Sequence, residues 1–236
     1  MAKPDGRGPV EPRQSSAWRS LTAAGRGPAE PGRKEGWIMA ASEAQRKTLK
    51  GREVLVGVTG GIAAYKAAML VSRLVEAGAR VSVVMTEHAT RFVAPLTFQT
   101  LSGRPVGTDL YAPPEGFMSE HLALADLAEV AVVAPATANL LGKLAHGIAD
   151  DLLTTVLLAL DAPVVVAPAM NVRMWAHPAV QANVEALRQR GVHVVGPEDG
   201  RLACGVKGKG RMAEPETILE ALAEALGSRP KRKGKG

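Results

Sequence analysis

This sequence has little cysteine, few aromatic residues and no long apolar run. A single cysteine among 236 residues excludes an internal disulfide and any zinc or iron–sulfur site built from several thiolates, and we predict no metal. Three Trp, two Tyr and three Phe are too few for a base-stacking surface that binds single-stranded nucleic acid. No stretch of about 18 uninterrupted apolar residues is present, so we expect neither a spanning helix nor a membrane partner. The remaining composition, 46% hydrophobic and 22% charged, is typical of a folded domain.

The net charge of +6 comes from the two ends of the chain. Residues 1–50 hold ten Lys or Arg and five Asp or Glu, and residues 229–236 hold five Lys or Arg and no acid. Residues 51–228 are left with 14 basic and 18 acidic residues, a net charge of −4. Because this central part is mildly acidic, the basic ends attract polyanions only loosely, and we predict no specific nucleic-acid partner.

The first 50 residues are rich in Gly, Pro, Arg and Ala without a sustained apolar period, so we predict a disordered extension over 1–50. They lack the apolar centre of a secretory signal and are too acidic for a transit peptide, so we expect a cytoplasmic protein. Met39 stands just ahead of the first predicted strand, and residues 1–38 are expected to be dispensable. Residues 228–236 are predicted to form a basic, disordered tail, which leaves 51–227 as the folded domain.

Within the predicted domain, short apolar strands alternate with segments of helical apolar spacing. This alternation predicts an α/β fold, with an open parallel sheet of about six strands between two layers of helices. Such a sheet binds ligands beyond the carboxyl ends of its strands, so the loops that follow strands are the places to look for chemistry. The predicted strands are 53–58, 80–85, 130–134, 163–167 and 192–195, and the predicted helices are 62–77, 95–101, 138–147, 151–160, 178–190 and 215–226.

The loop after the first strand, Gly57-Val58-Thr59-Gly60-Gly61-Ile62, is rich in glycine. A glycine-rich turn that opens a helix exposes backbone N–H groups and the positive end of the helix, which suits a phosphate. The glycines fall at 57, 60 and 61, so the loop is not the G-x-G-x-x-G fingerprint, and no Gly-Lys-Ser/Thr follows as in a P-loop. The loop therefore indicates either a phosphorylated ligand or a tight strand–helix turn.

Two further loops carry polar residues directly after strands. Glu87 follows the second strand, where an acid could hold the ribose of a nicotinamide cofactor. Taken alone, it is better explained by the first turn of a helix that Thr86 caps. Thr137 and Asn139 follow the strand 130–134, at a helix start where they could either cap the helix or bind a ligand.

Asn171, His121 and Cys204 stand out for other reasons. Asn171 lies in a segment bracketed by Pro168 and Pro178, which predicts a defined but non-helical excursion. His121 is a lone histidine ahead of a short apolar helix, and such a residue is more often structural than catalytic. Cys204 lies among three glycines and three cations, so we expect an exposed loop in which the cations favour the thiolate.

Taken together, these stretches resemble the homo-oligomeric, flavin-containing cysteine decarboxylases. The resemblance covers roughly residues 52–226 and is carried by Pro168-Ala169-Met170-Asn171 with Met174-Trp175, by Cys204-Gly205, and by His121 ahead of Ala134-Pro135. It is nearest to the members that convert 4′-phosphopantothenoylcysteine to 4′-phosphopantetheine in coenzyme A biosynthesis. The resemblance implies a flavodoxin-like or Rossmann-like sheet, bound FMN, a small phosphorylated cysteine amide as substrate, and assembly as a trimer or a dodecamer of trimers.

The resemblance also implies a role for each motif residue. His121 would be the catalytic acid or base, Cys204 the proton donor, and Asn171 the group that binds the substrate carboxylate, with Met174 beside it. Leu140 departs from the family, which often has Thr at that position. The sequence itself, rather than the resemblance, suggests a role for three cations near the cysteine, Lys207, Lys209 and Arg211. They are expected to stabilise the Cys204 thiolate, to bind the substrate phosphate, or simply to form a solvated loop. The residues implied to bind FMN are Gly60, Gly61, Ile62, Thr86, Thr137, Ala138, Asn139 and Ala169.

The implied chemistry accounts for these residue types. Direct loss of CO2 from a cysteine amide would leave an unstabilised carbanion. Prior oxidation of the thiol by the implied FMN, which would take up two electrons and later return them, gives a thioaldehyde whose C=S bond accepts the electrons that CO2 leaves behind. The resulting enethiolate is then protonated and reduced, so the net reaction is not a redox reaction.

Other functions stay open at this point. A peptide cysteine decarboxylase, a flavin prenyltransferase and a non-catalytic flavin-binding subunit share much of the pattern, whereas the glycine spacing disfavours a nicotinamide-dependent reductase. In many bacteria the decarboxylase domain is fused to a ligase that makes its substrate. The chain ends ten residues after the last predicted helix, so we expect a separate or fused ligase and a chain that either stands alone or is a fragment.

Overall fold

The computed structural model describes residues 43–112, 119–203 and 205–227. The chain divides into two units, residues 1–39 and 40–236, and every described residue belongs to the second. The disorder predicted for residues 1–42 and 228–236 cannot be compared with the structure, because these residues and Cys204 itself lie outside the described residues. In the part of the chain that is described, no helix has the length and apolar character needed to cross a membrane.

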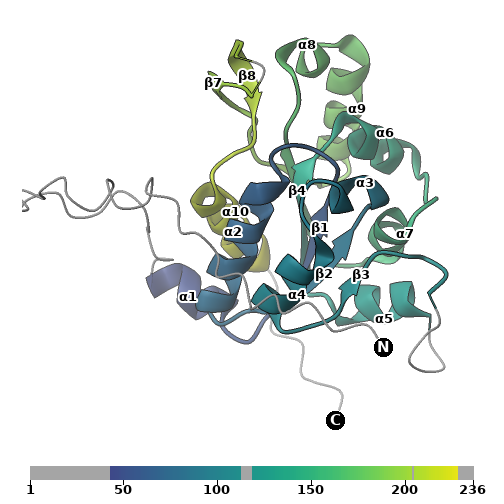
Figure 1. Ribbon diagram of the computed structural model, residues 1–236, viewed down its shortest axis with the longest axis vertical. Coiled ribbons are helices and arrows are strands. Elements are labelled where there is room, and N and C mark those ends of the chain that lie inside the picture. Colours follow the sequence, from purple (N-terminus) through teal and green to yellow (C-terminus); the bar gives the residue numbers. More distant parts are fainter. Residues whose placement is uncertain (1–42, 113–118, 204, 228–236) are drawn as a thin grey trace, which may run out of the picture. The chain divides into compact units, whose positions relative to one another are not determined.

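A six-stranded sheet forms the centre of the second unit (Figure 1). The strands lie in the order β3-β2-β1-β4-β5-β6, and every neighbouring pair is parallel. This arrangement confirms the predicted α/β fold and the number of strands. Their bounds are β1 (Glu53–Val58), β2 (Arg80–Met85), β3 (Val106–Gly107), β4 (Val130–Ala136), β5 (Val164–Pro168) and β6 (His193–Val194).

The central strands are buried along their whole length. Every residue of β1 and of β4 is buried, which explains why both read as unbroken apolar runs rather than as an alternating pattern. Successive side chains still point to opposite faces of the sheet, so Val54 and Val56 join one core cluster and Leu55 joins the other. The sheet therefore has a hydrophobic core on each side.

Helices cover both faces of the sheet (Figure 1). One core cluster includes residues of α1 (Glu43–Leu49), α2 (Ala64–Glu76), α4 (Pro95–Ser102) and α10 (Pro215–Gly227). The other includes residues of α5 (Glu120–Leu127), α6 (Ala138–His146), α7 (Leu152–Ala159) and α9 (Pro178–Gln189). Two single-turn helices, α3 (Glu87–Thr90) and α8 (Val172–Trp175), follow the carboxyl ends of β2 and β5.

A separate antiparallel hairpin is made by β7 (Glu198–Arg201) and β8 (Lys207–Arg211). It pairs with no strand of the main sheet. In Figure 1 the hairpin and α8 stand beyond the same end of the sheet, and they contact each other. The hairpin was not predicted, because Gly and Lys alternate in β8 where a strand is expected to alternate apolar and polar residues.

Two expectations from the sequence are corrected by the helices. The predicted extension over residues 1–50 includes α1, and Leu49 at its end is 0% exposed and packs in the core. A seven-residue helix with one buried residue has too little apolar periodicity to be recognised. The segment between the two prolines is not wholly non-helical, because residues 172–175 form the single turn α8.

Candidate active site

Four loops open at the carboxyl edge of the sheet, after β1, β2, β4 and β5. The strand order runs outward in two directions from β1 and β4, and an open sheet of this kind binds ligands in the crevice beyond such a pair. The loops that carry Gly60, Thr86, Thr137 and Ala169 all begin at this edge. The structure therefore brings the predicted cofactor-binding residues to one edge of the sheet.

Thr59 fixes the loop after β1 to the loop after β4. Its side chain is 2% exposed, and its Oγ1 donates to the carbonyl O of Pro135 at 2.6 Å. The same oxygen accepts from the backbone N–H of Thr137 at 3.2 Å. Sequence reasoning did not single out Thr59; the only available signal was a polar residue at the end of an apolar strand. These two bonds hold the two central loops in a set geometry.

Gly60 and Gly61 meet different surroundings. A Cβ on Gly60 would lie 2.9 Å from the carbonyl carbon of His88 and closer still to His88 Cβ, so the loop can pack against α3 only with glycine there. A Cβ on Gly61 would meet nothing nearer than Thr137 Cγ2 at 3.9 Å. The clash with His88 explains why residue 60 is a glycine. Gly61 instead faces open space beside the loop of Thr137.

The backbone of this loop is arranged to receive an anion. The N–H groups of Gly60, Gly61 and Ile62 donate no hydrogen bond to another described residue, and Ile62 is exposed. Neither α2 nor α6 has an acidic residue in its first turn. Because the N-terminus of a helix carries partial positive charge, two such helix starts at the same edge favour a negatively charged group.

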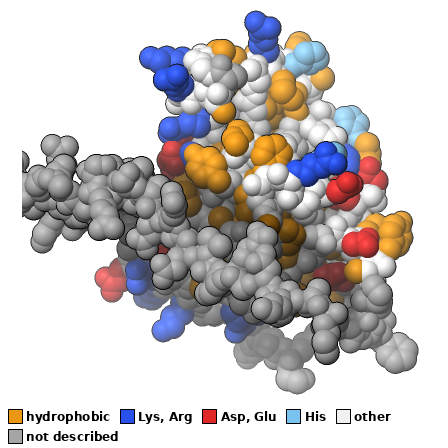
Figure 2. Space-filling view, in the orientation of Figure 1, with side chains coloured by type: hydrophobic (Ala, Val, Ile, Leu, Met, Phe, Trp, Pro, Cys, Tyr) orange, Lys and Arg blue, Asp and Glu red, His pale blue; other side chains and the backbone are white. Residues whose placement is uncertain are grey.

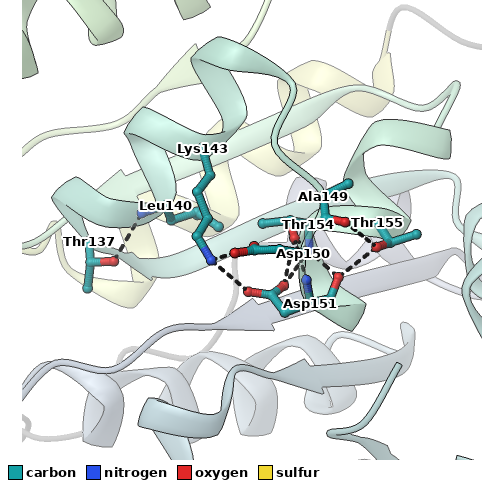
Figure 3. Close-up of polar contacts among 8 residues, drawn as sticks. All are labelled: Thr137, Leu140, Lys143, Ala149, Asp150, Asp151, Thr154 and Thr155. Atoms are coloured by element: carbon teal, nitrogen blue, oxygen red, sulfur yellow. Dashed lines mark hydrogen bonds and ion pairs between the residues drawn. The ribbon is translucent and has the colours of Figure 1, made fainter. Parts of the chain in front are cut away.

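The segment that follows β4 begins α6 (Figure 3). Thr137 Oγ1 accepts from the N–H of Leu140 at 3.3 Å, so Thr137 is the N-cap of α6. Ala138 is half-buried and Asn139 is exposed, so the Asn139 amide can reach a ligand at the surface. Leu140, which replaces a residue that is often Thr in the family, is buried in the core.

An ion-pair cluster ties the same helix to α7 (Figure 3). Lys143 Nζ lies 2.6 Å from Asp150 Oδ1 and 3.4 Å from Asp151 Oδ2. The hydrogen bond between Lys143 and Asp150 raises the pKa of the lysine and lowers the pKa of the aspartate. Asp151 also caps α7 by accepting from the N–H of Thr154 at 2.8 Å. Sequence reasoning missed this cluster, whose partners hold α6 and α7 together.

The loops after β2 and β5 are attached to their neighbours through the backbone. The N–H of Thr86 donates to Val58 O at 3.0 Å, and the N–H of Ala169 donates to Ala136 O at 3.1 Å. Glu87 lies in the first turn of α3, as the capping interpretation expected. The hydroxyl of Thr86 makes no capping hydrogen bond to that helix, so a side-chain cap is the wrong account of this residue.

Asn171 lies where the hairpin meets the loop after β5. The N–H of Met170 donates to Gly210 O of β8 at 3.0 Å. Asn171 Oδ1 accepts from the N–H of Arg173 at 2.8 Å, so Asn171 is the N-cap of α8. Met174, one turn along, is half-exposed.

The three cations of β8 differ in what they touch. Gly208 and Gly210 face the Met170–Val172 segment, since a Cβ on either would press on Val172 Cγ1 or Met170 O. Lys207 and Lys209 are exposed and point to the other face of the strand, because successive side chains alternate. Arg211 instead binds Glu198 and Glu214. Among the described residues, none of these contacts joins Lys207, Lys209 or Arg211 to Asn171.

His121 lies apart from these loops within the described chain. It is in the first turn of α5, and its ring nitrogen Nε2 lies 3.4 Å from Ser119 Oγ. Figure 1 draws α5 and α8 at opposite ends of the sheet. One copy of the chain therefore does not bring His121 to Asn171. The predicted partner Cys204 lies outside the described residues.

Comparison with known proteins agrees with this geometry. The chain is 56% identical over 176 residues to the coenzyme A biosynthesis bifunctional protein CoaBC of Bacillus subtilis (strain 168), a match that covers 75% of the chain and 43% of the relative. The chain thus spans less than half the length of that relative. It resembles the crystal structure of the FMN-dependent cysteine decarboxylase SpaF at 34% identity, with a TM-score of 0.67 over 77% of the chain and 99% of SpaF.

A second solved structure is a PPC decarboxylase with a cysteine-to-serine mutation, complexed with pantothenoylaminoethenethiol. It matches at 33% identity and a TM-score of 0.69, over 76% of the chain and all of that protein. A family model described as Flavoprotein matches residues 42–227, which include every described helix and strand. Since that match spans most of the sequence, the chain belongs to the flavoprotein family.

Proposed function

We propose that this chain binds FMN and decarboxylates 4′-phosphopantothenoylcysteine to 4′-phosphopantetheine, a step of coenzyme A biosynthesis. The observation that carries the proposal is the meeting of an anion-receiving loop, Gly60 to Ile62, and the Asn171 segment at one edge of the sheet. The likeness to a coenzyme A biosynthesis protein and to a PPC decarboxylase supports this substrate class over others.

The residues present fit FMN. The N–H groups of Gly60, Gly61 and Ile62 would hold the phosphate, and the open side of Gly61 leaves room beside Thr137. Thr86, Ala138, Asn139 and Ala169 lie in the neighbouring loops and would line the rest of the cofactor. When bound, FMN supplies the acceptance and return of two electrons. One phosphate loop without a dinucleotide fingerprint favours FMN over FAD or NAD.

The substrate residues follow from the chemistry. The NH2 group of Asn171 would orient the carboxylate that leaves as CO2. Cys204 would protonate the enethiolate, because an ordinary thiol with a pKa of about 8.5 is mostly protonated at neutral pH. His121 would hold or move a proton near the thiol and the carboxylate, and Met174 would lie beside the substrate.

A homo-oligomer completes this proposal, in the form of a trimer or a dodecamer of trimers. His121 belongs to α5 and Asn171 is the N-cap of α8. Because α5 and α8 lie at opposite ends of the sheet in Figure 1, a site that uses both residues needs two copies of the chain. Large apolar side chains also stay exposed on α2 and in the segments before α2 and α4, including Met69, Ile62 and Phe92. Figure 2 shows several hydrophobic side chains on one face of the molecule. Exposed apolar surface of this kind marks interaction sites. Light scattering that gives the mass of a single chain, 24.7 kDa, would contradict this part of the proposal.

The partners of the activity are also part of the proposal. The curated relative is bifunctional, and the chain covers 43% of it, so we propose that a phosphopantothenoylcysteine ligase, fused or separate, supplies the substrate. A cytoplasmic location fits such a pathway. The chain's likeness to SpaF makes a peptide with a C-terminal cysteine the second substrate to examine.

The deciding experiment compares substrates and cofactor in one preparation. Mass analysis of the released cofactor should give FMN, and CO2 release should be faster with the phosphorylated cysteine amide than with a peptide ending in cysteine. Asn171→Asp should stop CO2 release, since a second carboxylate would repel that of the substrate. Stoichiometric FAD or NAD, or a preference for the peptide, would overturn the proposal.

A further inference from the structure

Arg211 has a different role from the one its neighbourhood in the sequence suggests. We propose that Arg211 is a positioning residue, which holds β8 so that β8 in turn fixes the Met170–Asn171 segment, and that it does not bind the substrate phosphate. The part that concerns Asn171 as a substrate ligand rests on the function proposed above. The positioning itself rests only on contacts within the described chain.

The guanidinium of Arg211 is shared between two carboxylates. Its Nη2 lies 3.0 Å from Glu198 Oε2 and 2.9 Å from Glu214 Oε1. Glu198 is the cross-strand neighbour of Arg211 at the root of the hairpin, and its Oε1 accepts from the N–H of Glu214 at 3.3 Å. The stem of Arg211 runs along Gly200, where a Cβ would lie 3.4 Å from Arg211 Cδ. These contacts direct the side chain along the hairpin root.

Lys66 joins this network from α2, the helix that follows the anion-receiving loop. Its buried Nζ lies 3.0 Å from Glu214 Oε1 and donates to the carbonyl O of Met212 at 3.3 Å. Two cations, Lys66 and Arg211, thus face two carboxylates, Glu198 and Glu214. Because the charges balance, a phosphate at Arg211 would have to displace or approach two carboxylates, and like charges oppose it.

The backbone carries the position of β8 to Asn171. Gly210, next to Arg211, accepts the hydrogen bond from the N–H of Met170. Gly210 also packs so closely on Met170 O that a Cβ would not fit, and a Cβ on Gly208 would lie 2.9 Å from Val172 Cγ1. With glycine contacts on both sides of Asn171, a shift of β8 must move the segment that presents the Asn171 amide.

Hydrogen exchange tests the positioning without any substrate. In the FMN-loaded protein, Arg211→Gln and Glu198→Gln should each speed exchange of the Met170 N–H about twofold to fivefold, the range expected for losing partly exposed ion pairs. Arg201→Gln, which removes the same charge from the neighbouring strand, should leave that exchange unchanged. Arg211→Lys, which can keep one ion pair, should restore part of the protection. Equal exchange in Arg211→Gln and the parent protein would overturn the proposal.

Kinetics with two substrates separate positioning from phosphate binding. Arg211→Gln should raise KM about fivefold for both phosphopantothenoylcysteine and pantothenoylcysteine, which lacks the phosphate, with little change in kcat. A loss confined to the phosphorylated substrate would make Arg211 a phosphate ligand and overturn the proposal while leaving the proposed function intact. If the parent protein decarboxylates neither compound, the proposed function fails, and the exchange of the Met170 N–H still decides the positioning role.

Discussion

Gly60→Ala should damage the protein far more than Gly61→Ala, although the two glycines are neighbours in one loop. The added Cβ at residue 60 would lie 2.9 Å from the carbonyl carbon and 3.1 Å from the carbonyl oxygen of His88. Those atoms belong to the backbone of α3 and cannot rotate away. Added methyl groups in packed sites of this kind cost about 1–3 kcal/mol of unfolding free energy. For a domain of 150–250 residues, each kcal/mol lowers Tm by about 2–4 °C, so we expect a loss of about 2–12 °C.

Gly61→Ala is the matched control, because its Cβ would lie 3.9 Å from the nearest atom, Thr137 Cγ2. Both substitutions restrict the unfolded chain in the same way, so the difference between them isolates the clash with His88. The assay is thermal unfolding of the two variants and the parent protein, together with the flavin absorbance retained per chain. Gly60→Ala should also lose flavin, since relief of the clash moves the loop that would hold the phosphate. Equal Tm values for the two variants would refute the reasoning.

Three further predictions test other parts of the structure. Leu49→Ala should lower the free energy of unfolding in urea by about 2–5 kcal/mol, because it leaves a cavity where α1 meets the core; a change near zero would remove α1 from the fold. Lys143→Gln should lower Tm only in a middle range of pH. The raised pKa of Lys143 means that its contribution is lost as pH rises past 10.5, and the lowered pKa of Asp150 means that the contribution is lost as pH falls below 3.8, so a difference that persists at either extreme would contradict the ion pair. Cys204→Ser should bleach the flavin and release CO2 in a single turnover but then stall, because a hydroxyl is a far weaker acid than a thiol; normal turnover, or no bleaching, would rule out the late proton donor.

The sequence was most informative where local chemistry decides structure. β1 and β2 begin and end at the predicted residues because each is a β-branched run bounded by polar or glycine residues. The convergence of the loops after β1 and β4 also followed from the fold class, since parallel strands end at one edge. α1 and α8 were missed because helices of one or two turns have no measurable period.

Long-range contacts account for what the sequence did not reveal in the site. The apolar face expected of a strand is replaced in β8 by Gly208 and Gly210, whose role is visible only against Met170 and Val172. From its neighbours in sequence, Arg211 is expected to bind the substrate phosphate, to stabilise the Cys204 thiolate or to lie in a solvated loop. Its carboxylate partners instead come from the other strand and from the turn before α10. The distance of His121 from Asn171 depends on where α5 packs, which no local pattern encodes.

The separate pairing of the hairpin has an evolutionary consequence. Because β7 and β8 share no ladder hydrogen bond with the six-stranded sheet, changes in residues 198–211 leave the hydrogen bonding of that sheet intact. If the proposed function holds, the loops proposed to bind FMN and the hairpin beside Asn171 can therefore vary separately. Laboratory evolution toward a new cysteine-containing substrate is best confined to the exposed face of this hairpin, with Glu198, Gly208, Gly210 and Arg211 held constant to preserve its attachment.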